Sequence, residues 1–140
     1  MNADGRGSGL YVFLVEDHDI LRDVLGEYIR NLPAVAKCVT ASNAETALEG
    51  LAADLPDLML IDLTLPGMNG IELVRKLRRA YPQMPLAILS GHDSLSNAHD
   101  ALEAGANGYL LKGDMEEIVR GMEAIRAGSR YVSEGLSADP

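Results

Sequence analysis

Residues 58–70 of this 140-residue chain, LMLIDLTLPGMNG, combine the signals of a strand, a turn and the start of a helix. The stretch begins with four apolar residues, 58–61, that do not alternate with polar ones, which is typical of a strand covered on both faces. Asp62 follows directly, and Asn69 stands three positions before Glu72, the spacing of a helix capping box. The stretch therefore predicts a buried strand, an acidic turn and a helix over residues 71–81.

The same alternation of an apolar run and a helical pattern recurs along the chain. Residues 20–32 repeat apolar side chains at helical spacing, and Ser42 with Glu45 and Asp114 with Glu117 repeat the capping spacing. The predicted strands are 11–15, 58–61, 86–89 and 109–111, with a weaker and more exposed edge strand at 36–41. The predicted helices are 20–32, 44–53, 71–81, 94–104 and 115–127.

Strand and helix alternate five times, which indicates an α/β fold with a five-stranded parallel sheet and five helices on its two faces. The length suits one domain with one core. We expect this domain over residues 10–128, a flexible tail at 1–9, and the beginning of a linker at 129–140, where the last residues are polar with Gly and Pro.

Composition excludes several classes of function. The net charge is −9, which disfavours binding of nucleic acid or an anionic membrane by these residues. There is no apolar run of about 18 residues that could span a bilayer, and no signal-peptide pattern. Cys38 is the single cysteine, so no internal disulfide can form, and we expect a reducing, cytoplasmic location.

Polar side chains follow the predicted strands at the points where the strands end. Glu16 and Asp17 follow the first apolar run, Asp62 the third, Ser90 the fourth and Lys112 the last. Because the carboxyl ends of parallel strands share one edge of the sheet, where ligands bind in such folds, these five residues predict one site.

Three carboxylates at one site call for a cation. Two charges about 4 Å apart repel by about 4 kcal/mol at an effective dielectric near 20. Ligands that are all oxygens favour Mg²⁺, with Mn²⁺ as the alternative, over zinc. Mg²⁺ held in this way usually shares its site with a phosphoryl group, whose oxygens Lys112 and Ser90 would contact.

Four segments of the chain together resemble a response-regulator receiver domain: VEDHD (15–19), IDLTLPGMNG (61–70), ILSGHD (88–93) and GANGYLLKGD (105–114). The resemblance extends over about residues 10–127. It implies the flavodoxin-like (βα)5 fold with strand order 2-1-3-4-5. It also implies that Asp62 accepts a phosphoryl group from a phosphohistidine on a sensor histidine kinase. Such a domain is a switch and is not an enzyme beyond its own phosphorylation and dephosphorylation.

The resemblance also implies roles for the residues around Asp62. Asp17 and Asp62 bind Mg²⁺ directly, Glu16 acts through a water molecule, and the backbone carbonyl of Thr64 is a further ligand. For the acyl phosphate, the implied contacts are Ser90 and Lys112. Tyr109 matches the aromatic residue that changes rotamer when Ser90 is drawn toward the phosphoryl oxygen.

Residues 108–133, GYLLKGDMEEIVRGMEAIRAGSRYVS, resemble the receiver half of regulators with a LuxR-type or NarL-type helix-turn-helix output domain. This implies control of transcription through a C-terminal domain that these 140 residues do not contain. DNA would then bind only to that domain. The resemblance also leads us to expect homodimerisation on activation. Two positions depart from the family pattern. Glu16 stands where many receivers have Asp, and Gly113 follows Lys112 where many have a proline in a cis bond.

Other interpretations remain open at this point. Taken singly, Asp62 could be a turn residue, Lys112 a surface lysine, Ser90 a helix cap and Tyr109 ordinary core. A haloacid-dehalogenase-type enzyme also uses an aspartyl phosphate, but after its first strand and with an acid two positions later, where this chain has Thr64. A flavodoxin-like flavin binder would need a hydroxyl-rich and glycine-rich loop at 16–19. A pseudo-receiver would have lost a member of the site.

Overall fold

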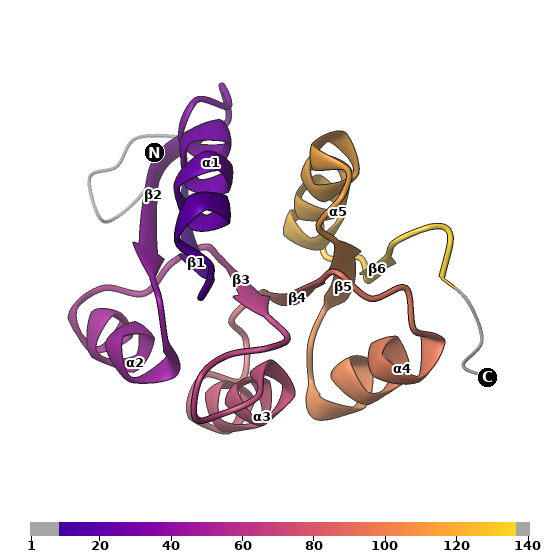
Figure 1. Cartoon of the computed structure of the whole chain (residues 1–140). Helices are drawn as coiled ribbons and strands as arrows, with labels where there is room; N and C mark the ends of the chain where they lie inside the picture. Colours follow the sequence, from indigo (N-terminus) through magenta and orange to yellow (C-terminus); the bar gives the residue numbers. More distant parts are fainter. Residues whose placement is uncertain (1–8, 137–140) are drawn as a thin grey trace.

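The five predicted apolar runs all form strands of one sheet, and a helix follows each of them (Figure 1). The computed structural model describes residues 9–136. The strands are β1 (Leu10–Val15), β2 (Val35–Ala41), β3 (Leu58–Asp62), β4 (Leu86–Ser90), β5 (Gly108–Leu111) and β6 (Tyr131–Val132). The helices are α1 (Asp19–Arg30), α2 (Ala44–Ala53), α3 (Gly70–Ala80), α4 (Leu95–Ala104) and α5 (Met115–Arg126).

The sheet has the strand order β2-β1-β3-β4-β5-β6, and every neighbouring pair is parallel. The first five strands confirm the predicted flavodoxin-like order, with the predicted weak strand β2 at one edge. β6 was not predicted. It lies within residues 129–140, the range expected to begin a linker, so the sheet continues past the predicted domain end at residue 128.

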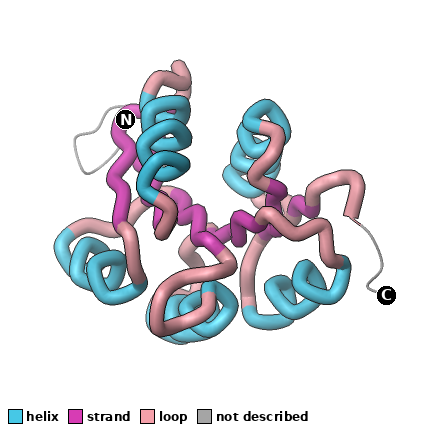
Figure 2. The backbone as a smooth tube through the Cα atoms, viewed as in Figure 1, coloured by secondary structure: helices cyan, strands magenta, loops and turns pink. Residues whose placement is uncertain are grey.

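Helices cover both faces of the sheet, as predicted. α1 and α5 lie on one face, and α2, α3 and α4 lie on the other (Figure 2). Side chains of β1 alternate between the two layers: Val12 and Leu14 pack with α1 and α5, whereas Phe13 and Val15 pack with α2 and α3. All four are buried, and each such side chain contributes about 1.5–3 kcal/mol when fully buried.

The residues that cap the N-termini of the helices agree with the prediction for two helices out of three. Asn69 and Asp114 cap α3 and α5 as predicted. For α2 the prediction of Ser42 was wrong by one residue, because Asn43 Oδ1 accepts the hydrogen bond from the Thr46 amide at 2.8 Å. Glu45 is therefore the second residue of α2 and does not complete the capping box predicted with Ser42.

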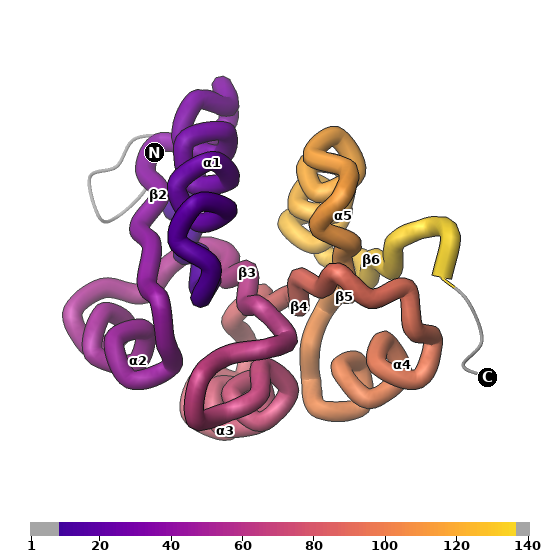
Figure 3. The backbone as a smooth tube through the Cα atoms, viewed as in Figure 1, coloured from indigo at the N-terminus to yellow at the C-terminus, as the bar shows by residue number. Residues whose placement is uncertain are grey.

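The path of the chain brings distant segments of sequence to one edge of the sheet. It starts at β1, steps out to β2, and then crosses the sheet to β5 and β6 (Figure 3). Since all pairs are parallel, every strand ends at the same edge. Within residues 9–136, none of the helices combines the length and the apolar character that crossing a bilayer requires.

Candidate functional site

The carboxyl ends of β1, β3, β4 and β5 meet at one rim. Asp62 and Ser90 are the last residues of their strands, and Glu16 and Lys112 come directly after theirs. Backbone hydrogen bonds continue the sheet past these ends, from the Leu63 amide to the Leu89 carbonyl at 2.8 Å and from the Lys112 amide to the Ser90 carbonyl at 2.9 Å. The neighbouring strand ends are therefore held in register at the site.

Lys112 joins two carboxylates of this rim. Its Nζ lies 2.8 Å from Glu16 Oε1 and 3.0 Å from Asp62 Oδ1. Burial alone would lower the pKa of Lys112, but hydrogen bonds and attraction from Glu16 and Asp62 outweigh it and raise the pKa above its ordinary value. Lys112 is therefore a cation throughout the neutral range.

Glu16 is the most deeply buried acid of the site, with no exposed surface. Burial raises its pKa, while Lys112 and the His18 amide, which donates to Oε2 at 3.0 Å, act in the opposite direction. The charge of Asp62 raises the pKa of Glu16 further. Glu16 Oε1 accepts no hydrogen bond of good angle from the described residues, and the nearby Lys112 ammonium is its compensation.

The two oxygens of Asp62 have different surroundings. Oδ1 is fixed by the Lys112 ammonium at 3.0 Å and by the Thr64 amide, which donates at 3.1 Å. Among residues 9–136, none is seen to donate a hydrogen bond to Oδ2. The carboxylate is thus oriented through one oxygen, which leaves the other available for a bond to an incoming group.

The predicted metal ligands were Glu16, Asp17, Asp62 and Thr64. In the described part of the chain, no three His, Cys, Asp or Glu side chains converge in an arrangement that could hold a metal ion. Asp17 is exposed at the rim, and the Lys112 ammonium lies where Glu16 and Asp62 meet. The donor types still fit a hard cation, because Glu16 and Asp62 present buried carboxylate oxygens, and Glu16 Oε1 is compensated by a positive charge, the Lys112 ammonium at 2.8 Å.

Ser90 and Tyr109 both hold the turn between β4 and α4. The buried Ser90 Oγ accepts a hydrogen bond from the His92 amide at 3.0 Å. The Tyr109 ring is fully buried on the α4 side of the sheet, and its hydroxyl donates to the His92 carbonyl at 2.7 Å. Ser90 and Tyr109, the two residues predicted to form a switch, therefore both form hydrogen bonds with the backbone of His92.

Arg22 is a positioning residue that the sequence interpretation missed. Its guanidinium donates to the Glu16 carbonyl at 3.0 Å and pairs with Asp19 Oδ1 at 2.8 Å, so it fastens the acidic loop to α1. The i,i+3 spacing of Asp19 and Arg22 was a signal for the ion pair but not for the contact with the loop carbonyl.

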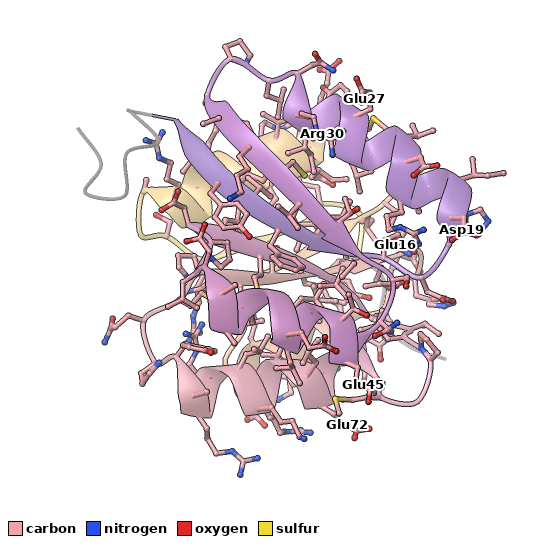
Figure 4. All side chains as sticks on the ribbon, turned by 90° about the vertical axis from the view of Figure 1, so that its left-hand side faces the viewer. Glu16, Asp19, Glu27, Arg30, Glu45 and Glu72 are labelled. Atoms are coloured by element: carbon pink, nitrogen blue, oxygen red, sulfur yellow. The ribbon has the colours of Figure 1, made fainter. Side chains whose placement is uncertain are left out.

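Acidic side chains extend the rim beyond the site. Figure 4 shows Glu16, Asp19, Glu45 and Glu72 toward one end of the molecule, where the strands end and the helices begin. The last three stand in the first turns of their helices, where the helix dipole favours a negative charge. The rim combines this negative border with the partly buried ammonium of Lys112.

The fold and the rim together define a class: a flavodoxin-like α/β domain that presents one oriented aspartate beside a lysine, with a serine at the end of the adjacent strand. The chain belongs to the response regulator receiver domain family, whose model matches residues 12–123. Domains of this family are signalling switches rather than classical enzymes.

Individual relatives place the chain among receivers of LuxR/NarL-type regulators. It is 37% identical over 129 residues to the nitrate/nitrite response regulator protein NarL of Escherichia coli, covering 90% of this chain and 59% of the relative. It is 35% identical over 133 residues to the transcriptional activator protein ExaE of Pseudomonas putida, with the same coverage. The chain thus spans about three fifths of the length of these relatives.

Solved structures agree with this placement. A LuxR-family two-component response regulator from Aurantimonas sp. SI85-9A1 superposes with a TM-score of 0.87 at 36% identity, covering 92% of this chain and 93% of that one. The receiver domain of the putative regulator NarL from Mycobacterium tuberculosis gives a TM-score of 0.76 at 27% identity, with coverages of 86% and 98%. The resemblance expected from the sequence motifs is confirmed.

Proposed function

We propose that Asp62 accepts a phosphoryl group from a phosphohistidine of a sensor histidine kinase. The observation that carries this proposal is the orientation of Asp62, with Oδ1 held by Lys112 and the Thr64 amide and Oδ2 without a donor among the described residues. In the transfer, Oδ2 forms the new bond to phosphorus while the bond from phosphorus to the imidazole nitrogen breaks. The imidazole leaves as the neutral base after taking up a proton.

The chain's own residues position the acceptor and compensate charge, which is most of what phosphoryl transfer to a carboxylate requires. Lys112 stays beside Asp62 and compensates negative charge on the phosphoryl oxygens. Glu16, Asp17, Asp62 and the Thr64 carbonyl would hold Mg²⁺ or, as the alternative, Mn²⁺. The bound ion would neutralise the charge of the transferred group.

An exposed apolar patch beside the rim supports a protein as phosphoryl donor. Ile20 and Val24 of α1 are 70% and 50% exposed, and Ile20 lies three residues after Asp17. Large apolar side chains that remain exposed next to a site are typical of a protein-binding surface. A kinase domain that covers this patch would bring its phosphohistidine to the rim at Asp62.

The phosphoryl group carries about −2 charge and replaces the single negative charge of the Asp62 carboxylate. The negative charge at a site held by one lysine therefore increases, so the neighbouring groups must rearrange. Ser90 and Tyr109 are the groups that would transmit the change, because both fix the turn after β4. The output would be control of transcription by a helix-turn-helix domain beyond this chain, which the greater length and the names of the relatives support. Homodimerisation on activation is part of the same proposal.

The structure favours this function over the flavin-binding alternative. At the end of β1, where a phosphate would have to bind, the loop presents the buried Glu16 and the exposed Asp17. Both would repel a phosphate. The ion pairs of Lys112 with Glu16 and Asp62 argue against the pseudo-receiver alternative, in which a member of the site would be lost.

Incubation with acetyl phosphate and Mg²⁺, followed by intact-mass measurement, tests the proposal. We expect one phosphoryl adduct on the wild type and on Asp23→Asn, a matched change of an exposed aspartate on α1, and none on Asp62→Asn. An adduct that persists in Asp62→Asn, or the lack of an adduct on the wild type, would contradict the proposal.

A further inference from the structure

Residues 131–136, which we call the strap, run along the outer edge of β5. Figure 1 shows this yellow segment beside β5, between the sides occupied by α5 and α4. β6 forms the first part of the strap and pairs Tyr131 with Gly108 and Val132 with Tyr109. The Tyr131 amide donates to the Asn107 carbonyl at 3.1 Å, and the Ser133 amide donates to the Tyr109 carbonyl at 2.9 Å. The strap thus occupies the edge of the sheet that β5 would otherwise expose.

Two glycines make room for the strap. A Cβ on Gly108 would lie 2.7 Å from the Tyr131 carbonyl oxygen, which is too close for any side chain without a shift of the backbone. A Cβ on Gly121 of α5 would clash with Leu110 and would lie 3.1 Å from the Tyr131 ring. The surface of β5 and α5 is therefore shaped to receive an extended segment with an aromatic residue at this position.

The strap wraps around the edge of the sheet and packs on both layers. Tyr131 packs with the residues between the sheet and α1 and α5, whereas Leu136 packs with the layer of α2, α3 and α4. The carboxylate of Glu117, which is buried on α5, accepts hydrogen bonds from the Glu134 amide at 3.0 Å and the Tyr131 hydroxyl at 3.4 Å. Apolar and polar contacts both anchor the strap.

Ser133 connects the strap to the phosphorylation site. Its side chain is buried, and its Oγ accepts a hydrogen bond from the Leu111 amide at 2.9 Å. Leu111 directly precedes Lys112, and the Ser133 amide is bonded to the carbonyl of Tyr109. The strap therefore contacts the backbone of the two β5 positions through which Lys112 and Tyr109 are held.

We infer that the edge of β5 is a docking site for the chain's own residues 131–136, and that phosphorylation of Asp62 weakens this docking. The coupling rests on the proposed function. A phosphoryl group on Asp62 adds negative charge beside Lys112, and the shift of Lys112 toward it is passed to the adjacent Leu111, whose amide bonds Ser133. The strap is the part that gives way, because it is a two-residue edge strand with Val132 exposed, and such elements open before the core.

Hydrogen exchange resolved by residue in NMR tests the docking without any phosphoryl donor. Ser133→Ala removes the acceptor of the Leu111 amide, so this amide should exchange between about threefold and tenfold faster, as expected for the loss of one hydrogen bond. Ser129→Ala, a matched change at an exposed position before the strap, should leave the rate unchanged. Equal rates in wild type and Ser133→Ala would overturn the docking.

The coupling is tested in a second arm, with acetyl phosphate and Mg²⁺ and with intact mass read from the same sample. We expect the Leu111, Ser133 and Glu134 amides to exchange faster in the phosphorylated chain, while amides inside α1 keep their rates. By reciprocity, Ser133→Ala should become phosphorylated severalfold more completely at a limiting donor concentration. An adduct with unchanged exchange would overturn the coupling alone. The lack of an adduct would contradict the proposed function and the coupling together, and would leave the docking to be judged by the first arm.

Discussion

Lys112 Nζ lies 2.8 Å from Glu16 Oε1, a carboxylate oxygen with no exposed surface and no hydrogen bond of good angle. The same ammonium lies 3.0 Å from Asp62 Oδ1. One cation therefore compensates two buried acids that come from different strand ends. Because burying a carboxylate without compensation costs several kcal/mol, this arrangement decides both the stability and the charge balance of the site.

Replacing Lys112 by methionine keeps an unbranched side chain of nearly the same length but removes its charge. We expect Lys112→Met to lower the free energy of unfolding by about 3 kcal/mol at neutral pH, since two buried carboxylates lose their compensation. Urea denaturation measures this loss. The double variant Glu16→Gln/Lys112→Met should recover part of it, because one of the two charges is removed as well. Lys76→Met, at an exposed position of α3, should change the stability little, and an equal loss there would refute the explanation.

Arg22→Gln removes the bond from the guanidinium to the Glu16 carbonyl and the ion pair with Asp19. We expect a loss of about 1 kcal/mol in the free energy of unfolding. A higher Mg²⁺ concentration should also be needed for half-maximal phosphorylation by acetyl phosphate, because the acidic loop is less well fixed. Arg79→Gln, at an exposed position of α3, serves as the control. If both variants need the same Mg²⁺ concentration as the wild type, Arg22 does not position the loop.

Tyr109→Phe removes the hydroxyl that donates to the His92 carbonyl at 2.7 Å. We expect a loss of about 1 kcal/mol in stability and faster hydrogen exchange of amides in the turn between β4 and α4. Tyr81→Phe, at the end of α3, should leave this turn unaffected. Unchanged exchange in Tyr109→Phe would show that the hydroxyl does not hold the turn.

The ionisation of the buried Cys38 thiol should differ between the folded and the unfolded chain. Burial raises the pKa of its thiol from the ordinary value of 9.0 to about 11, so at pH 8 the folded chain should hold about a hundredfold less thiolate than the unfolded chain. Alkylation by iodoacetamide should therefore be at least about a hundredfold slower in buffer than in urea.

The sign of the linked stability change follows from the same shift. The folded state keeps a proton between pH 9 and pH 11 that the unfolded state loses, so this contribution to stability is present below pH 9 and is lost as the pH rises through about 11. Cys38→Ala should lack this part of the pH dependence. Rapid alkylation of the folded chain at pH 8 would be inconsistent with a buried thiol.

The parallel sheet could be predicted because each central strand is an uninterrupted apolar run and helical patterns separate these runs. The order of its strands followed only from the resemblance to the receiver family. β6 could not be predicted. Tyr131 and Val132 form a two-residue strand only because β5 offers a free edge and Gly108 leaves space beside it. Ser42 was predicted as a cap in place of Asn43 because either residue type can accept the capping hydrogen bond, and spacing alone does not choose between neighbours.

The members of the site could be predicted from their positions after the strands, but their mutual arrangement could not. Sequence indicated a cluster of acids around a cation. In the structure the charge compensation comes from Lys112, and Asp17 lies exposed at the rim. The contact of Arg22 with a backbone carbonyl depends on how α1 leaves the acidic loop, and side-chain pattern carries no signal for it.

Chemical trapping identifies the residue that accepts the phosphoryl group, which we propose to be Asp62. Borohydride reduces an aspartyl phosphate to homoserine, and peptide mass spectrometry then locates the converted residue. After treatment with acetyl phosphate and Mg²⁺, we predict homoserine at position 62 and at none of the other aspartates. Homoserine at Asp17 or Asp19 with Asp62 unmodified would show that another aspartate is the acceptor. The lack of homoserine in a chain that carries a phosphoryl adduct would show that the adduct is not an aspartyl phosphate.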